Sequence, residues 1–296
     1  MFRKLCARCI RTVIGPLMIA VALFPVLNAP PAAAVVCGQS TPEKENPPTA
    51  IHILLIGQDR REEETLSRAD SILLCTFHPD SQEITITSFL RDLYVPIPGY
   101  PANRLNAAYA HGGMALLRQT IEENFDIPIN GCIEVDFNQF AQVLDILGGV
   151  TMELRQDEAE AINTAVPGTL TEGSHLLTGS QALAYTRIRN LDADGDFSRT
   201  CRQRKVISSL LGSYREANLF TVLSIIPKIL PILSTDMEHK QVVATTLQLL
   251  PMLKGCTITN HQVPAKDMYS YRTVRGMSVL SADLELIRQE LAETLS

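Results

Sequence analysis

The chain has 296 residues, of which 46% are hydrophobic and 20% charged, and its formal net charge is −6. Once an N-terminal segment is set aside, the remaining length suits one domain of roughly 250 residues with a full core. The negative charge argues against a surface that coats nucleic acid, so no nucleic-acid partner is expected. Any anion-binding site must therefore be a local cluster of basic residues on a protein whose net charge is negative.

Residues 1–36 are typical of a targeting segment. Four basic residues precede an uncharged and mostly apolar run over 12–27, and three alanines at 32–34 suit a cleavage site. The apolar run is short for a membrane-spanning helix and contains two prolines, so a cleaved signal peptide and a retained signal-anchor both stay open. Either reading predicts an extracytoplasmic domain, secreted or tethered to the cell membrane through this segment.

After the targeting segment, residues 37–49 form a polar linker, and one domain is predicted over 50–296. Five widely spaced cysteines follow the targeting segment, and their spacing matches no metal site. One or two disulfides and buried reduced thiols both remain open. The five are Cys37, Cys75, Cys132, Cys201 and Cys256.

The first part of the domain carries strand patterns. Apolar runs over 51–56 and 71–77 predict buried strands, and alternation over 83–89 predicts a third. The short turn between the second and third strands favours an antiparallel hairpin. Later patterns predict helices over 114–125, 137–147, 180–185, 198–214 and 281–295, and strands over 150–154 and 257–263.

Strands mixed with helices predict an α/β fold, a single three-layer α-β-α domain around a mixed sheet with antiparallel pairs. Gly112 and Gly113 are expected in a loop at a helix start. The apolar run over 219–233 contains Pro227 and Pro231. We expect it to be core, although its prolines also suit the edge of a lipid groove.

One segment near residue 200 concentrates arginines. With residues from 198 onward in a helix, Arg199, Arg202 and Gln203 fall on the stripe that faces the core further along. Buried guanidiniums need anionic partners, and a helix N-terminus favours an anion. Arg204 and Lys205 project elsewhere and are expected to meet solvent.

Residues just before this helix add to the cluster. Asp196 is a candidate N-cap, and Arg187 and Arg189 alternate on a segment expected to be extended. The planar fork of arginine suits phosphate oxygens. A surface salt-bridge network with Asp192, Asp194 and Asp196 is the alternative.

A second cluster lies upstream. Asp59 follows the first predicted strand and Asp70 opens the second, so an antiparallel pairing would bring both carboxylates to one end of the sheet. The third strand would return Arg91 and Asp92 to the same end, near Arg68. Two carboxylates beside arginines suit a Mg²⁺ site for a phosphate-bearing ligand, although ordinary loop charges are the alternative.

The chain resembles the LytR-CpsA-Psr family of bacterial envelope proteins over about residues 50–215. Its motifs occur in the family's order, in the segments 53–60, 67–71, 89–95, 104–113, 184–189 and 195–204. Two residues depart from the usual pattern. Leu90 replaces a proline before Arg91, and Arg104 replaces a lysine, which keeps the charge but changes its geometry.

The resemblance implies a Mg²⁺-dependent enzyme that transfers a glycopolymer from an undecaprenyl-pyrophosphate-linked carrier to peptidoglycan, forming a phosphodiester. It implies that Asp59 and Asp70 hold the metal. The implied pyrophosphate-binding residues are Arg68, Arg91, Arg104, Asn106, Arg187, Arg189, Arg199 and Arg202. The implied catalytic residues are Arg91, Asp92, Asp196, Arg199 and Gln203, with Asp92 or Asp196 as the proton acceptor.

Two other functions remain open on the sequence. One is hydrolysis of lipid pyrophosphates at the same site, with water in place of the acceptor sugar. The other is a non-enzymatic envelope protein that captures polyprenyl phosphates. The polymer itself is also open, with teichoic acid, capsule and other cell-wall glycans as candidates.

Overall fold

The structure, a computed structural model, describes residues 50–58, 68–189, 191–192, 196–215, 217 and 219–295. The targeting segment, Asp59 and the side chain of Asp196 lie outside this part. Residues Asn46–Ser296 form one compact unit by their internal contacts. Within the described ranges, no helix is both long enough and apolar enough to cross a membrane.

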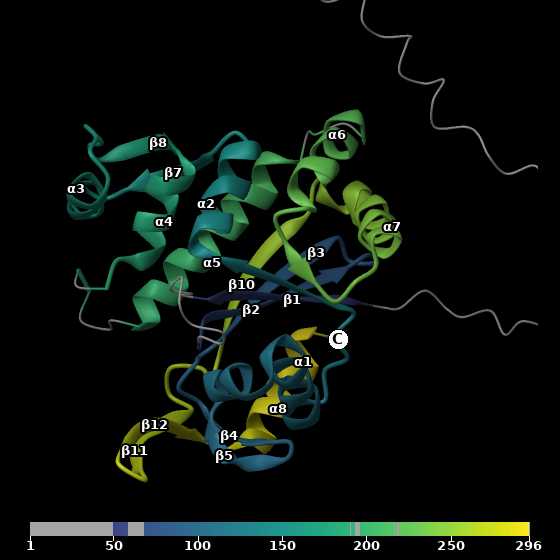
Figure 1. The fold of residues 1–296 in the computed structure, drawn as a ribbon, viewed down its shortest axis with the longest axis vertical. Coiled ribbons are helices and arrows are strands. Elements are labelled where there is room, and N and C mark those ends of the chain that lie inside the picture. The colour runs from purple at the N-terminus through teal and green to yellow at the C-terminus, as the bar shows by residue number, and fades with distance from the viewer. Residues whose placement is uncertain are drawn as a thin grey trace, which may run out of the picture. The chain divides into compact units, whose positions relative to one another are not determined.

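A six-stranded sheet with the strand order β10-β3-β2-β1-β6-β9 runs through the middle of this unit (Figure 1). β2 pairs antiparallel with both β1 and β3, whereas β6 runs parallel to β1 and β10 parallel to β3. The predicted mixed sheet and its antiparallel hairpin are therefore confirmed. The strands are β1 Ile51–Gln58, β2 Ala69–His78, β3 Glu83–Phe89, β6 Gly131–Asp136, β9 Ser234–Thr235 and β10 Thr257–Val263.

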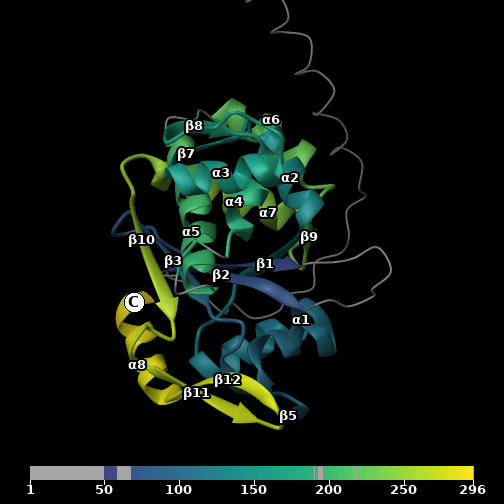
Figure 2. The same ribbon diagram turned by 90° about the vertical axis from the view of Figure 1, so that its left-hand side faces the viewer.

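Helices cover both faces of the sheet (Figure 2). Leu54 and Ile56 of β1 point to the face covered by α1 and α8, while Ile51 and Ile53 point to the face covered by α5 and α7, as the two-residue period of a strand requires. The layered arrangement agrees with the prediction. The helices are α1 Leu105–Phe125, α2 Phe137–Ile146, α5 Asp196–Ser213, α6 Leu219–Ile229, α7 His239–Leu249 and α8 Leu284–Leu295.

Smaller elements lie beyond the central layers. A separate core joins α2, α3, α4 and α5 to the β7–β8 hairpin around Leu144, Val150 and Tyr185. Two further hairpins, β4–β5 and β11–β12, lie on the α1 side of the sheet (Figure 1). These elements are β4 Tyr94–Ile97, β5 Tyr100–Arg104, β7 Val150–Leu154, α3 Gln156–Ala165, β8 Gly173–Leu177, α4 Gly179–Arg187, β11 Tyr269–Val274 and β12 Met277–Ala282.

One expectation changes in detail, and one open alternative is narrowed. α1 begins at Leu105, nine residues before the predicted start, and Gly112 and Gly113 form a kink inside it, where Gly113 has a φ of 62°. The four described cysteines are all free thiols, so the structure favours the reduced alternative for them. Burial raises the pKa of Cys75 to about 12.

Candidate functional site

The register of the sheet brings three described members of the predicted cluster, Asp70, Arg91 and Asp92, to one end. β1 ends at Gln58, which lies opposite Ala69 at the start of β2. β3 runs back antiparallel to β2, with Ser88 opposite Leu73, and the chain then continues to Arg91. The start of β2 and the residues after β3 therefore meet, as the pairing of the predicted strands required.

A chain of alternating charges occupies this end. Arg91 Nη1 forms an ion pair with Asp70 Oδ1, and Arg91 Nε lies 3.8 Å from Asp92 Oδ2. Arg104 Nη1 lies 3.4 Å from Asp92 Oδ1, and its Nε donates to the backbone carbonyl of Ser278 at 3.0 Å. These four charged side chains are only partly buried, so they remain accessible to a ligand.

The first turn of α1 also contacts Arg91. The backbone N–H of Asn106 donates to the carbonyl of Arg91 at 3.1 Å. The Asn106 side chain is buried, yet its Oδ1 has no hydrogen-bond partner in the part of the chain that the structure describes. Buried polar atoms are nearly always paired in folded proteins, and an unsatisfied acceptor beside Arg91 indicates a position that a ligand or water completes.

α5 joins this end of the sheet through two contacts. Arg199 Nη2 donates to the backbone carbonyl of Asp70 at 3.2 Å, and Gln203 Oε1 accepts from Ser71 Oγ at 3.0 Å. Arg199 is buried, as its helical phase predicted. The two clusters, more than a hundred residues apart in the sequence, therefore form one site.

Arg202 also points inward, but its partners are carboxylates of the protein. Its Nε donates to Glu158 at 2.9 Å, and its Nη2 pairs with Asp192. Burial alone would lower the pKa of Arg202, but these two carboxylates raise it. The predicted contact with pyrophosphate has no support in this geometry. For Arg202 and Asp192, the salt-bridge alternative describes what the structure contains.

The next two residues of α5 differ from one another. Lys205 is exposed, as expected, but Arg204 is buried at 8% exposure, so the expectation that it meets solvent is wrong. Arg204 Nη1 donates to Ser88 Oγ at 2.7 Å, because α5 lies across β3. Helical phase alone could not reveal this, since the width of the sheet under the helix decides how much of its surface is covered.

Three arginines of the predicted clamp are exposed: Arg68, Arg187 and Arg189. Arg187 ends α4 and is therefore helical, not extended as expected. Its guanidinium carbon lies 4.5 Å from the ring centroid of Phe137, a cation–π contact. The structure thus places Arg187 beside the wall of the cavity that Phe137 lines.

That cavity, of about 310 Å³, is almost entirely apolar and lies between the sheet, α2 and α5. The few polar groups in its lining include Ser71 and Gln203, the pair that joins α5 to β2. An apolar space therefore opens beside the charged end of the sheet. Its apolar lining includes Leu55, Ile56, Leu73, Ile133, Val135, Phe137, Phe140, Val143, Leu144, Ile207, Leu210 and Leu233.

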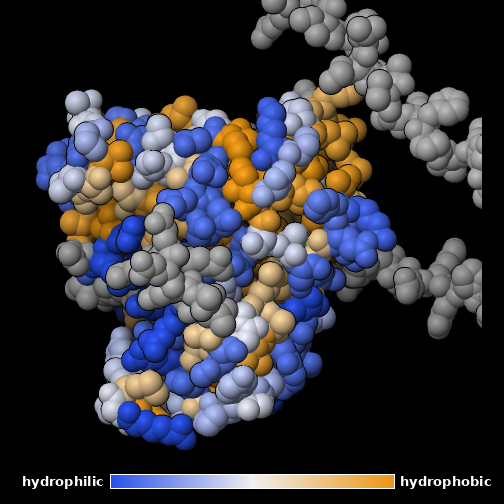
Figure 3. Space-filling view, viewed as in Figure 1, coloured by the Kyte–Doolittle hydropathy of each residue, from blue (hydrophilic) through white to orange (hydrophobic). Residues whose placement is uncertain are grey.

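A neighbouring apolar cavity of about 330 Å³ shares Ile133, Leu210 and Leu233 with the first and is lined further by α6 and α7. None of the α6 residues is buried, and Phe220 is 82% exposed. Figure 3 shows the apolar surface over this region. The expectation that residues 219–233 are core is wrong, and the groove-edge alternative fits.

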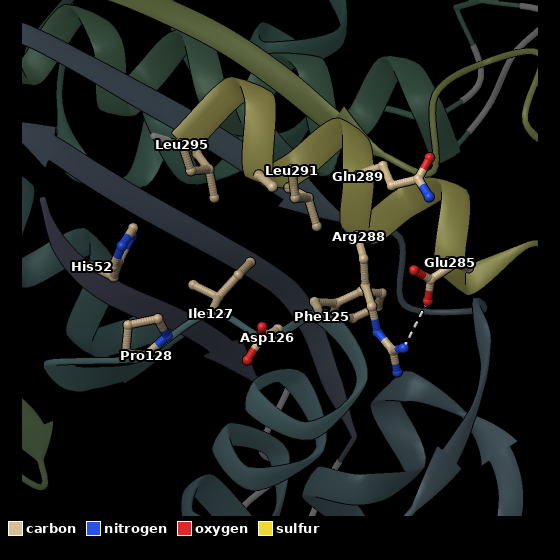
Figure 4. A pocket seen from close by; sticks show the side chains of 11 residues that line it. His52, Phe125, Asp126, Ile127, Pro128, Glu285, Arg288, Gln289, Leu291 and Leu295 are labelled. Atoms are coloured by element: carbon tan, nitrogen blue, oxygen red, sulfur yellow. Dashed lines mark hydrogen bonds and ion pairs between the residues drawn. The ribbon is translucent and has the colours of Figure 1, made fainter.

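A further cavity, of about 370 Å³, lies on the opposite face of the sheet, between α8 and the loop after α1 (Figure 4). Its arginine, Arg288, is already engaged: Nη1 pairs with Glu285 at 3.0 Å and Nε donates to the carbonyl of Asn124 at 2.6 Å. None of the predicted site residues lines it. This cavity is therefore separate from the charged end of the sheet.

Few side chains that could coordinate a cation lie together in the described part of the chain. Among the described residues, no group of three or more histidines, cysteines or carboxylates gathers. Mg²⁺ commonly takes one or two carboxylates and completes its shell with water and phosphate oxygens. Asp70 offers one such carboxylate, with Arg91 paired to it and Arg199 bound to its backbone carbonyl. This donor chemistry fits Mg²⁺ held jointly with a phosphate-bearing ligand.

The sequence matches the model of the LytR_cpsA_psr family over residues 34–293. A curated relative is the polyisoprenyl-teichoic acid–peptidoglycan teichoic acid transferase TagU of Oceanobacillus iheyensis. It is 35% identical over 64% of this chain and 58% of its own length. The Bacillus cereus TagU is 36% identical over 57% and 54%. The chain thus spans a little over half the length of these relatives.

Solved structures match more of the chain. A structure of TagT bound to LI-WTA has a TM-score of 0.68 and 26% identity, with 84% of this chain and 91% of that chain covered. The family protein YwtF (TagT) with bound octaprenyl pyrophosphate lipid has a TM-score of 0.63 and 25% identity, over 84% and 91%. Both carry the same mixed sheet flanked by helices.

Proposed function

The chain belongs to the LytR-CpsA-Psr family, and on that premise we propose that it transfers a glycopolymer from a polyprenyl-pyrophosphate carrier to peptidoglycan. One observation carries the proposal: an apolar cavity opens beside a cluster of arginines at the end of the sheet. A polyprenyl pyrophosphate has the matching halves, an apolar chain and a charged head. The TagT structure with bound octaprenyl pyrophosphate supports this assignment.

The apolar cavity and the charged groups beside it bind different parts of the ligand. The isoprenoid chain occupies the space between α2 and α5, where burial of apolar surface contributes about 25 cal/mol per Å². The head lies at the N-terminal end of α5, where the helix dipole favours an anion. Arg199 and Arg91 are already held in position there by their contacts with Asp70.

The transfer step needs positioning and charge neutralisation more than covalent catalysis. An acceptor sugar hydroxyl attacks the phosphorus nearest the glycan, and a new O–P bond forms. The bridging P–O bond to the lipid phosphate breaks, and the lipid monophosphate leaves with the electron pair. A carboxylate, Asp92 or Asp196, accepts the hydroxyl proton. Arg91 and Arg199 stabilise the charge that grows on the leaving phosphate.

We assign Mg²⁺ to Asp70, with Asp59 as its predicted second carboxylate. When bound, the cation would neutralise negative charge on the pyrophosphate oxygens. The buried Oδ1 of Asn106, which has no hydrogen-bond partner among the described residues, would accept a hydrogen bond from the bound ligand or from water. Arg68, Arg187 and Arg189 would approach the head from the exposed side.

The names of the TagU relatives favour a teichoic acid as the polymer. Such a reaction takes place on the outer side of the membrane, with the N-terminal segment as a tether or a removed signal. Capsule and other cell-wall glycans use the same linkage chemistry. The residues that contact the glycan, and not those that contact the pyrophosphate, therefore determine which polymer is transferred.

The test is transfer of a radiolabelled polyprenyl-pyrophosphate-linked glycan to peptidoglycan by purified full-length protein. The variant Asp70→Asn should lose most turnover while binding of the polyprenyl pyrophosphate changes little. Asp80→Asn, in the exposed turn at the other end of the β2–β3 hairpin, is the matched control. Release of free phosphorylated glycan without a covalent product would identify a hydrolase instead. Transfer by Asp70→Asn at the wild-type rate would contradict the assignment of Mg²⁺ to Asp70.

A further inference from the structure

A polar cavity of about 510 Å³ lies on the other flank of α5 from the apolar cavity. The apolar cavity extends over β1, β2 and β6, whereas this one is bounded by β10, the loop after it and β11. Two neighbouring residues of α5 mark the division, because Gln203 lines the first cavity and Arg204 the second. Figure 2 shows β10 at one edge of the sheet and β11 below it, next to α8.

Aromatic rings form one wall of this polar cavity. The rings of Phe197 and Tyr269 stack with centroids 5.3 Å apart, and Tyr271 meets Tyr269 edge-on at 5.7 Å. Tyr271 is 68% exposed, so its ring is presented to solvent instead of being used in a core. The face of an aromatic ring carries partial negative charge and attracts the C–H groups of a pyranose.

Polar side chains complete the lining. Asn260 and Gln262 of β10 offer amide donors and acceptors, the groups that pair with sugar hydroxyl and N-acetyl groups. Apolar or aromatic faces combined with a few placed polar groups are typical of small-molecule sites. This composition differs from the apolar cavity, whose lining offers almost nothing to a hydroxyl group.

Arg204 adds a buried positive charge to the wall. Among the described residues no carboxylate lies within ion-pair distance of it, and its Nε has no hydrogen-bond partner. Burial lowers the pKa of this guanidinium. A buried cation without an anionic partner is costly, and a ligand bearing a carboxylate would offset that cost. The carboxylates of the peptide stem of peptidoglycan have the required charge.

Reaction geometry places the acceptor on this flank. In phosphoryl transfer the attacking and leaving oxygens are roughly in line with phosphorus. With the lipid phosphate leaving toward the apolar cavity, the nucleophile must arrive from the opposite side of the phosphorus. The polar cavity lies on the other flank of α5 from the apolar cavity, and Phe197 in the first turn of α5 lines it. We infer that this cavity, lined by Phe197, Arg204, Tyr269 and Tyr271, binds the amino-sugar acceptor strand of peptidoglycan.

This inference rests on the proposed function, and the experiment separates the two. Initial rates are measured at saturating lipid-linked donor with varied, undecorated peptidoglycan oligomers. Tyr271→Ala and Tyr269→Ala should each raise the acceptor KM at least tenfold, with kcat within threefold and donor binding unchanged. Tyr100→Ala is the matched control, because Tyr100 is an exposed tyrosine stacked on His111 in the separate β4–β5 hairpin.

Direct binding gives a second readout. Saturation-transfer NMR of a soluble muropeptide with the full chain should show contact in the wild type and loss of it in Tyr271→Ala. An acceptor KM within twofold of wild type in both tyrosine variants would overturn the inference while leaving the transferase intact. A rise in the donor KM alone would show that the cavity binds the donor glycan, and this result would also overturn the inference. A wild type that binds muropeptide through Tyr271 but transfers nothing would contradict the proposed function and retain the acceptor site.

Discussion

Arg199 Nη2 donates to the backbone carbonyl of Asp70 at 3.2 Å and thereby joins the first turns of α5 to the start of β2, 129 residues earlier. The side chain of Asp70 pairs at the same time with Arg91. One residue of β2 thus positions both arginines, one through its backbone and one through its carboxylate. The distance between the two cationic groups is set by the sheet, a rigid element, and this preorganisation suits stabilisation of developing charge.

Replacing Arg199 with lysine should lower the transfer rate about 100-fold, the typical effect of losing one preorganised donor. Lysine keeps the charge but cannot hold the Asp70 carbonyl and present a second N–H in a fixed plane. Single-turnover rates at saturating donor provide the measurement. Lys205→Ala, an exposed position on the same helix, should leave the rate unchanged. Rates of Arg199→Lys within threefold of wild type would contradict this role.

Filling the apolar cavity should separate lipid binding from head-group binding. Ile207 lines the cavity between α5 and the sheet, and Ile207→Trp would occupy much of the space of about 310 Å³. We expect octaprenyl pyrophosphate to bind at least tenfold more weakly, while inorganic pyrophosphate binds within twofold of wild type. Calorimetry with both ligands measures this difference.

The matched control for the cavity is Leu176→Trp, which adds the same ring to an exposed position of β8. It should bind both ligands as the wild type does. Equal loss of both ligands in Ile207→Trp would indicate a general disturbance of the fold and not a lipid site. A melting curve recorded for each variant distinguishes these outcomes.

Replacing Arg202, which is paired with Glu158, should lower the free energy of unfolding and leave ligand binding unchanged. Both side chains are at most 5% exposed, and Arg202→Met would leave Glu158 buried without its partner. Removing one member of a buried ion pair costs about 3–5 kcal/mol. Urea unfolding should show this loss, and the double variant with Glu158→Gln should recover part of it. A double variant as unstable as Arg202→Met would show that burial of Glu158 is not the cause.

The sequence was informative where a local pattern decides the structure. The strand patterns and the short turn between β2 and β3 predict their antiparallel hairpin, and this pairing brings Asp70 to Arg91. The antiparallel pairing of β1 with β2 entered the sequence argument only as a condition, and the structure contains it. Helical phase likewise placed Arg199 toward the core. The approach of α5 to β2 is a long-range contact, and the sequence suggested it only because each cluster lacked the charges of the other.

Other features depend on which surfaces the tertiary structure covers. Arg202 and Arg204 both point inward, but only the fold reveals Glu158 beside the first and Ser88 beside the second. The apolar run of α6 has the composition of a core helix, yet Phe220 stays exposed, because this helix borders a cavity. Composition measures how apolar a helix is and not what it faces.

His52 should make the protein less stable in mild acid. Its ring is buried against β2, where Nδ1 lies 3.0 Å from Thr76 Oγ1, and burial together with the nearby His78 lowers its pKa from 6.5 to about 4. Below pH 6.5 the unfolded state therefore binds a proton that the folded state does not, and the free energy of unfolding falls as the pH drops toward 4. This difference between the pKa of His52 in the folded and unfolded states lowers the free energy of unfolding by about 3 kcal/mol once the pH is below both pKa values. Urea unfolding between pH 7 and pH 4 should show this loss in the wild type and a flatter dependence in His52→Gln. Identical pH dependence in the two proteins would mean that His52 is protonated as readily in the fold as in the unfolded chain.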